Sequence, residues 1–315
     1  MVLGYSGVDI SSKVKLISRL LIKGPVSNSL RCEVLEELNP SWNGIHEFQI
    51  RLLAHESLSW ISGSGRNARI GIAWIKALME LSEALIARGS GLQSRVGLAG
   101  GLCDASAIAR AKAECIERDA FLYHYQSGES AQYVGNVASE VGIHLEVYRL
   151  ASAFHGFETC LVWDRQYSTS GSGGLSFGTS AASDFSLAKS EAIREWASTR
   201  DVLMKRALDL CRMDSDENQF SSSSNPKRIH LDACFDRRNI DRFNRCFRRE
   251  QLYLPNRSML REVHEEWLIR TFESPIHFGK FVHASHPALE SLFFGHPEPL
   301  SALEDQSAPL FHPFW

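Results

Sequence analysis

The chain has 315 residues, 44% of them hydrophobic, so it is long enough to form one large or two ordinary domains with a normal core. Its 34 basic and 37 acidic side chains nearly balance, so we expect neither nucleic acid nor a membrane surface as a partner. A cytoplasmic protein is predicted, because no apolar run approaches membrane-spanning length and the N-terminal apolar residues lack a cleavage-site pattern.

The seven cysteines do not form a recognisable disulfide or metal pattern. Their number is odd, and no two of them form a C-x-x-C pair. The twelve histidines are scattered and do not provide the spacing of a zinc finger. We therefore expect reduced thiols and no structural metal.

The first part of the chain, residues 1–60, is predicted to contain a helix followed by strands. Residues 9–23 have apolar side chains at helical spacing, and Gly24 and Pro25 end the pattern. Between Arg31 and Ile61 the apolar residues come in short runs separated by turn residues, which favours strands over long helices.

A pattern of two alanines and two glutamates, at spacings of four, three and three residues, recurs behind glycine-rich turns. Its copies are Ala73–Ala77–Glu80–Glu83, then Ala107–Ala111–Glu114–Glu117 at an offset of 34 residues, and Ala188–Ala192–Glu195 with Ser198 in the last place. One copy is a weak signal, because alanine and glutamate are both good helix formers. Three copies indicate an internal repeat, and their uneven spacing does not fit a solenoid.

The second copy, in residues 94–120, is the most informative for chemistry. Glu114 and Glu117 are neighbours on one helix face, where like charges repel unless a cation lies between them. Mg²⁺ binds carboxylates together with substrate phosphates, and the glycine-rich turn Gly97–Gly101 would present backbone N–H groups to phosphate. The alternative is an ordinary solvated helix on which Glu114 pairs with Arg118. Recurrence of the pattern favours a shared site.

The remaining segments complete a layered α/β arrangement. Residues 144–151 and 157–165 have the composition of strands, and residues 261–273 and 279–285 are predicted to form a helix and a strand. A polar, serine-rich insert near residues 213–228 is predicted to be flexible. Residues 228–254 concentrate arginines, which form either a solvated helix face or a contact surface for peptide or phosphate: Arg237, Arg238, Arg242, Arg245, Arg248 and Arg249.

These motifs resemble those of the YcaO-domain family. GLAGG…AKAECIERDA in residues 97–120 is similar to that family's central signature, and the first and third copies resemble its flanking motifs. FGKFVHASHPALESLFFG and the C-terminal FHPFW also resemble family segments. The resemblance covers roughly residues 60–315. It implies an α/β, layered YcaO-like domain over residues 61–315, with internal helix repeats that carry clustered glutamates around a nucleotide site.

The resemblance also implies a function. YcaO-domain enzymes use ATP and Mg²⁺ to phosphorylate a backbone amide oxygen of a peptide, and the amide carbon is then attacked. A neighbouring Cys, Ser or Thr side chain gives an azoline, whereas an external sulfur donor gives a thioamide. A cyclodehydratase-type enzyme acting on a ribosomally synthesised precursor peptide is therefore expected. A separate leader-binding or TfuA-like protein is the expected partner, and a homodimer is compatible with the sequence.

The resemblance assigns roles to individual residues. The expected metal ligands are Glu80, Glu83, Glu114 and Glu117. The expected nucleotide-binding residues are Arg66, Ser94, Arg118 and Glu195. In the tail, proline restricts the backbone and aromatic side chains could insert into a cleft, which would bring Pro313 and Trp315 to the catalytic site. The alternative for the tail is a frayed apolar end.

Some positions depart from the family pattern. Ala84 stands where an arginine is usual, and Arg95 and Val96 replace a Ser-Asn pair before the glycine-rich turn. These departures support a second hypothesis, a degenerate scaffolding or peptide-binding subunit without ATP turnover. A third, an unrelated nucleotide-binding α/β protein, requires the repeat to be a coincidence.

Overall fold

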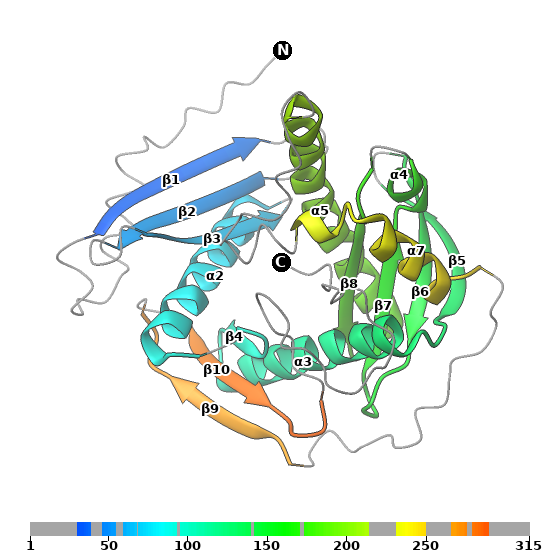
Figure 1. Ribbon diagram of the computed structural model, residues 1–315. Helices are drawn as coiled ribbons and strands as arrows, with labels where there is room; N and C mark the ends of the chain where they lie inside the picture. Colours follow the sequence, from blue (N-terminus) through cyan, green and yellow to red (C-terminus); the bar gives the residue numbers. More distant parts are fainter. Residues whose placement is uncertain are drawn as a thin grey trace. The chain divides into compact units, whose positions relative to one another are not determined.

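The computed structural model describes residues 30–38, 46–54, 59–67, 69–92, 95–139, 142–170, 173–213, 231–249, 266–275 and 279–289 (Figure 1). The chain divides into two compact units, one comprising Met1–Lys112 and Leu268–Ser285, the other Ala113–Trp267 and His286–Trp315. The predicted N-terminal helix lies outside the described residues, as does the predicted polar insert beyond Met213. None of the described helices has a stretch long and apolar enough to cross a bilayer.

The first unit contains an antiparallel sheet covered by a helix (Figure 1). Its strands, in the order β1-β2-β3, are β1 (Leu30–Leu38), β2 (His46–Ala54) and β3 (Ser59–Asn67). Strands were predicted between Arg31 and Ile61, and the structure confirms them. Gly63 and Gly65 were predicted to form a turn before the helix, but they lie within β3. The helix, α2 (Ile70–Ser90), packs on β2 and β3 and ends at Gly91, whose φ of 65° is left-handed.

The backbones of β3 and α2 lie unusually close together. A Cβ added to Gly63 would stand 2.2 Å from the backbone nitrogen of Leu81, and one added to Gly65 would stand 2.0 Å from the carbonyl oxygen of Ala73. Ala73 and Ala77 are themselves completely buried. The glycines of β3 and the alanines of α2 therefore face each other across one strand–helix contact, where no larger side chain fits.

A second antiparallel sheet of the first unit has the order β4-β10-β9, with strands β4 (Leu98–Gly101), β9 (Leu268–Phe272) and β10 (Lys280–Ser285). The strand predicted at 279–285 is confirmed. The helix predicted over 261–273 is wrong where β9 lies, because Leu268–Phe272 pairs with β10, opposite Ser285 to Phe281. Pairing with a partner strand outweighs a helical spacing of apolar residues in such a short segment.

The second unit is built on an antiparallel sheet with the order β5-β6-β7-β8. Its strands are β5 (Gln132–Ala138), β6 (His144–Leu150), β7 (Glu158–Trp163) and β8 (Phe177–Ala182). Its helices are α4 (Arg165–Thr169), α5 (Phe185–Met213) and α7 (Arg237–Cys246), together with most of α3 (Asp104–Ser127), which starts in the first unit.

Helices cover both faces of this sheet. Phe177 of β8 stacks on Phe121 of α3 at 5.3 Å and contacts Phe243 of α7 at 5.0 Å. The next residue, Gly178, points to the opposite face, where an added Cβ would stand 2.2 Å from the carbonyl oxygen of Ala192 in α5. The second unit is therefore a helix–sheet–helix sandwich, which confirms the predicted layered α/β fold.

Candidate functional site

Three of the predicted site glutamates accept hydrogen bonds from backbone amides of edge strands. Among the described strands, β3, β4 and β8 each lie at the edge of their sheet. An edge strand leaves every second N–H group without a partner strand, and such groups need another acceptor. The donor–acceptor pairs are Ser64 with Glu80 at 2.9 Å, Gly100 with Glu83 at 2.7 Å, and Thr179 with Glu195 at 3.2 Å.

The same local geometry occurs in both units. Ser64 precedes Glu80 by 16 residues, and Thr179 precedes Glu195 by the same number. In each case a glycine lies directly before the donor, and it allows the helix to approach the strand. The internal repeat is therefore a strand–helix unit in which small residues permit close packing and a glutamate satisfies the exposed edge of the strand.

In the second unit the structure brings Glu117, Arg118 and Glu195 together. Arg118 Nη1 lies 3.2 Å from Oε1 of Glu117, and Nη2 lies 3.5 Å from Oε1 of Glu195. Thr179 connects the two carboxylates, because its hydroxyl donates to Oε1 of Glu117 at 2.7 Å while its amide donates to Glu195. Three elements, α3, β8 and α5, thus position one charged cluster.

Sequence reasoning missed Thr179. A signal was present, because a hydroxyl residue follows a glycine 16 positions before the glutamate in both Ser64 and Thr179. That spacing has a meaning only once β3 and β8 are known to be edge strands, so the sequence alone did not reveal it.

Burial controls the charge of Glu117, which is 8% exposed. Loss of water is the largest cause that raises the pKa of Glu117, and the negative charges of Glu195 and Glu114 raise it as well. Arg118 and the Thr179 hydroxyl lower it, and the net result is a pKa of about 8. Burial therefore favours the protonated form of this carboxyl group. A cation that binds here would replace that proton.

Two carboxylates of the cluster, Glu117 and Glu195, are of the type that can bind Mg²⁺. Among the described residues there is no group of three or more His, Cys, Asp or Glu side chains that could hold a metal by themselves. Mg²⁺ is commonly held by one or two carboxylates, and water and substrate phosphates complete its coordination. Glu117 and Glu195 fit that requirement. Glu114, on the same helix, contributes to the electrostatic field at both Glu117 and Arg118.

The other predicted site residues lie in the first unit or outside the described residues. Glu80 and Glu83 lie on α2, and Arg66 lies on β3 close to Ser64. Ser94, Pro313 and Trp315 lie outside the described residues. That the glutamates of both units form one site stays a prediction.

The glycine-rich turn Gly97–Gly101 differs from the prediction. Gly97 is in a left-handed turn with φ of 79°, but Leu98–Gly101 forms β4 and pairs with β10. The peptide groups on either side of the Gly100 Cα are also engaged, since its N–H donates to Glu83 and its carbonyl oxygen accepts from Arg110 at 2.6 Å. The Gly100 amide is therefore a structural donor to Glu83, whereas we had expected it to face phosphate.

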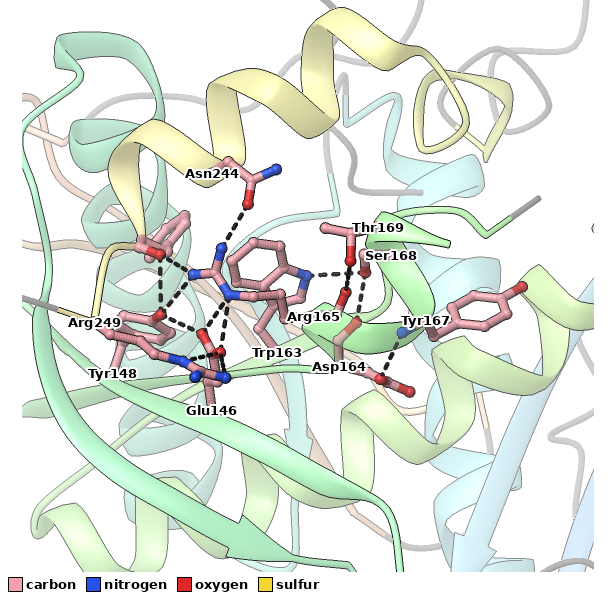
Figure 2. A network of polar contacts seen from close by, with 11 residues as sticks. Glu146, Tyr148, Trp163, Asp164, Arg165, Tyr167, Ser168, Thr169, Asn244 and Arg249 are labelled. Atoms are coloured by element: carbon pink, nitrogen blue, oxygen red, sulfur yellow. Dashed lines mark hydrogen bonds and ion pairs between the residues drawn. The ribbon is translucent and has the colours of Figure 1, made fainter. Parts of the chain in front are cut away.

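A further buried charged cluster, which the sequence did not predict, surrounds Glu146 in the second unit (Figure 2). Glu146 is 2% exposed, and its carboxylate accepts from Arg165 at 2.8 Å, from Arg249 at 2.6 Å and from the Tyr148 hydroxyl at 2.5 Å. The Arg165 guanidinium lies 3.9 Å from the centre of the Trp163 ring. Two arginines and a hydroxyl thus compensate the free-energy cost of burying one carboxylate.

This cluster fixes the C-terminal end of α7 to the sheet. Arg165 also donates to the side-chain oxygen of Asn244 and to the carbonyl oxygen of Phe247, both at 2.5 Å (Figure 2). Phe247 packs in turn against Phe243 and Tyr148. We regard the Glu146 cluster as a structural anchor for α7.

Comparison with known proteins adds information about the fold. No protein-family model matches the sequence, and no curated protein matches it. Solved structures do match. YcaO from Methanopyrus kandleri, bound with AMPPCP and Mg²⁺, superposes with a TM-score of 0.51 at 12% identity, over 82% of this chain and 85% of that one.

Two further structures agree with this result. The E. coli microcin synthetase McbBCD complex with pro-MccB17 bound matches with a TM-score of 0.52 at 9% identity, over 86% of this chain and 91% of the matched chain. A heterocyclase in complex with substrate and cofactor matches with a TM-score of 0.53 at 11% identity, over 91% of this chain. The match covers 53% of the heterocyclase, so this chain spans about half of its length. At these identities the likeness concerns the fold, and the protein has a YcaO-like fold.

Proposed function

We propose that the protein uses ATP and Mg²⁺ to activate a backbone amide of a ribosomally synthesised precursor peptide. The observation that carries the proposal is the partly buried Glu117–Arg118–Glu195 cluster, organised by Thr179. Support comes from the fold, which resembles that of a YcaO bound with AMPPCP and Mg²⁺ and that of a heterocyclase bound with substrate and cofactor.

In this proposal Glu117 holds the metal ion together with Glu195, which the resemblance in sequence assigns to the nucleotide. Glu114 is the further metal ligand that the resemblance implies. When bound, Mg²⁺ neutralises charge on the phosphates during phosphoryl transfer. Thr179 keeps both carboxylates in place by donating to each of them. Arg118 lies between the two carboxylates and would reach phosphate oxygens once the cation compensates their charge.

We further propose roles in binding metal and nucleotide for residues of the first unit. Glu80 and Glu83 would be the additional metal ligands, each oriented by a backbone amide. Arg66 and Ser94 would contact the nucleotide, and Pro313 and Trp315 would contribute from the tail. These assignments follow from the resemblance in sequence.

The proposed substrate is a precursor peptide presented by a separate leader-binding protein. Support comes from the McbBCD complex, which carries pro-MccB17 bound. The product is an azoline or a thioamide. Mass spectrometry of a peptide co-expressed with this protein distinguishes them, since azoline formation loses water and thioamide formation exchanges oxygen for sulfur.

The proposal is tested by ATP hydrolysis, measured with and without candidate peptide and partner. The variant Glu117→Gln keeps the shape of the side chain and removes its charge. The matched control is Glu191→Gln on α5, because Glu191 is exposed and pairs only with the exposed Arg194 among the described contacts. Turnover should be lost in the first variant and kept in the second. Equal turnover in both would overturn the assignment.

A second candidate function is a scaffolding or peptide-binding subunit that does not turn over ATP. The observation that favours it is the environment of Ala84, which packs against the apolar cluster of the first unit where the family usually has an arginine. Calorimetry with Mg-ATP separates the two candidates, because a scaffold of this kind should not bind the nucleotide.

A further inference from the structure

The second unit contains a pocket of about 420 Å³ between the C-terminal end of α3 and α7. One wall is the last turn of α3 and the chain that follows it, and the other is the C-terminal half of α7 with Arg248 just beyond it. The described residues that line it are Gln126, Ser127, Gly128, Ser130, Arg242, Arg245, Cys246 and Arg248. None of these residues is part of the Glu117 cluster.

The α3 wall of the pocket is held by several hydrogen bonds. Gly128 ends α3 with φ of 74° and donates its N–H to the carbonyl oxygen of His124. The His124 ring accepts the N–H of Ala151 at Nε2, so its Nδ1 carries the proton and donates to the carbonyl oxygen of Glu129 at 2.8 Å. Ala131 donates to the carbonyl oxygen of Cys246 at 3.1 Å, which joins the two walls.

Arg242 is fixed within the pocket. Its guanidinium donates to the carbonyl oxygens of Tyr125 and Gln126, which are among the last acceptors of α3, and it lies 5.2 Å from the centre of the Tyr125 ring. Directly after α7, the carbonyl oxygen of Phe247 accepts a hydrogen bond from Arg165 of the Glu146 cluster. Arg242 is therefore a preorganised positive charge in the lining of the pocket.

Arg245 and Arg248 are exposed at the edge of the same pocket. The arginines at the start of α7 differ from them, since Arg237 pairs with Asp241 and Arg238 pairs with Asp236. The described lining residues thus carry three guanidinium groups and no carboxylate. Guanidinium groups bind carboxylates and phosphates in a bidentate manner, so the pocket should bind an anion.

We propose that this pocket binds the carboxylates of an acidic peptide segment. A volume of about 420 Å³ corresponds to roughly a dozen water molecules, which is more than one small oxyanion fills. The exposed Arg245 and Arg248 at its edge suit a chain that passes over the surface with two or more acidic side chains. Three arginines on a protein with a formal net charge of −3 give too short a basic surface for nucleic acid. The inference does not depend on the proposed ATP chemistry.

The test is a fluorescence anisotropy titration of the full-length protein with fluorescein-labelled hexaglutamate, and with labelled hexaglutamine as the uncharged probe. The variant Arg245→Gln/Arg248→Gln removes two charges from the pocket at exposed positions. The control Arg194→Gln/Arg237→Gln removes two charges at exposed positions elsewhere, so both proteins have the same net charge. Circular dichroism melts establish that all variants fold.

We expect hexaglutamate to bind the wild type and the control equally, and the pocket variant at least about tenfold more weakly, because two charge-assisted contacts are lost. Hexaglutamine should not bind. The proposal is overturned if hexaglutamate does not bind, or if both double variants bind it equally. Binding of inorganic pyrophosphate with no binding of hexaglutamate would also overturn it, and would assign the pocket to a small phosphate ligand.

Discussion

The backbone N–H of Thr179 lies 3.2 Å from Oε2 of Glu195, 16 residues further along the chain. This contact satisfies an amide at the edge of the second unit's sheet, and Ser64 makes the corresponding contact with Glu80 in the first unit. A motif that suggested metal binding from its sequence therefore also has a structural function. In the second unit both functions are compatible, since the amide holds a carboxylate in position for a cation.

The hydroxyl of Thr179 should matter for stability as well as for the site. Thr179→Val keeps the β-branched shape and the backbone amide but removes the hydrogen bond to Glu117. We expect the free energy of unfolding in urea to fall by about 1–2 kcal/mol, because a buried acceptor loses its donor. Thr179→Ser retains the hydroxyl and should recover most of this loss. Equal losses in both variants would contradict a role for the hydroxyl.

Glycines at the strand–helix contact should not tolerate a side chain. Gly65→Ala would place Cβ 2.0 Å from the carbonyl oxygen of Ala73, so α2 must move away, and we expect a loss of about 1–3 kcal/mol or more. Gly89→Ala, in the same helix α2, meets nothing within 4 Å. It should stabilise the protein by about 0.5–1 kcal/mol. Thermal melts of the two variants should therefore shift in opposite directions.

The repeat shows how far sequence reasoning reached at the site. The spacing of Ala73, Ala77 and Glu80 correctly placed these residues on one helix, but the glycines before it, which were predicted to form a turn, lie within the strand β3. It did not reveal that Glu80 contacts Ser64, because that contact depends on β3 being an edge strand. Edge position is set by pairing of the whole sheet and has no local signal.

The protonation of Glu117 predicts a pH dependence of stability. Burial raises its pKa from the ordinary value of 4.5 to about 8, so the folded state favours the protonated form. That contribution is fully present below about pH 4.5 and is lost as the pH rises through about 8, where the buried group must ionise. Relative to Glu117→Gln, the wild type should lose stability over this range. Urea titrations of both proteins at several pH values check this prediction. A difference in the free energy of unfolding between the wild type and Glu117→Gln that does not change with pH would contradict the raised pKa of Glu117.

The Glu146 cluster, which anchors α7 to the sheet, should contribute strongly to the stability of the fold. Glu146→Gln removes the counter-charge of the largely buried Arg165, whereas Arg249 is exposed and can be solvated, and we expect a loss of about 3 kcal/mol in the free energy of unfolding. Arg194→Gln breaks an exposed pair with Glu191 and should cost at most about 1 kcal/mol. Comparable losses in the two variants would show that the buried cluster has no special role.

This cluster also explains what the sequence did not disclose. Glu146 contacts Arg165 and Arg249, which are 19 and 103 residues away, and no spacing rule connects such positions. The strands that carry Glu146 and Trp163 were predicted, because their β-branched and aromatic residues are a local signal. Residues 268–272 were expected to be helical, and their strand structure depends on β10, which comes later in the chain.

The central claim is that the Glu117–Arg118–Glu195 cluster binds Mg²⁺ together with a nucleotide. Isothermal titration calorimetry with Mg-ATP tests it most directly, on the wild type, on Glu195→Gln and on the exposed control Glu191→Gln. We predict that the wild type and the control bind with the same affinity and that Glu195→Gln binds at least about tenfold more weakly, because a carboxylate ligand is lost. Absence of binding to the wild type, or equal affinity in all three proteins, would contradict it.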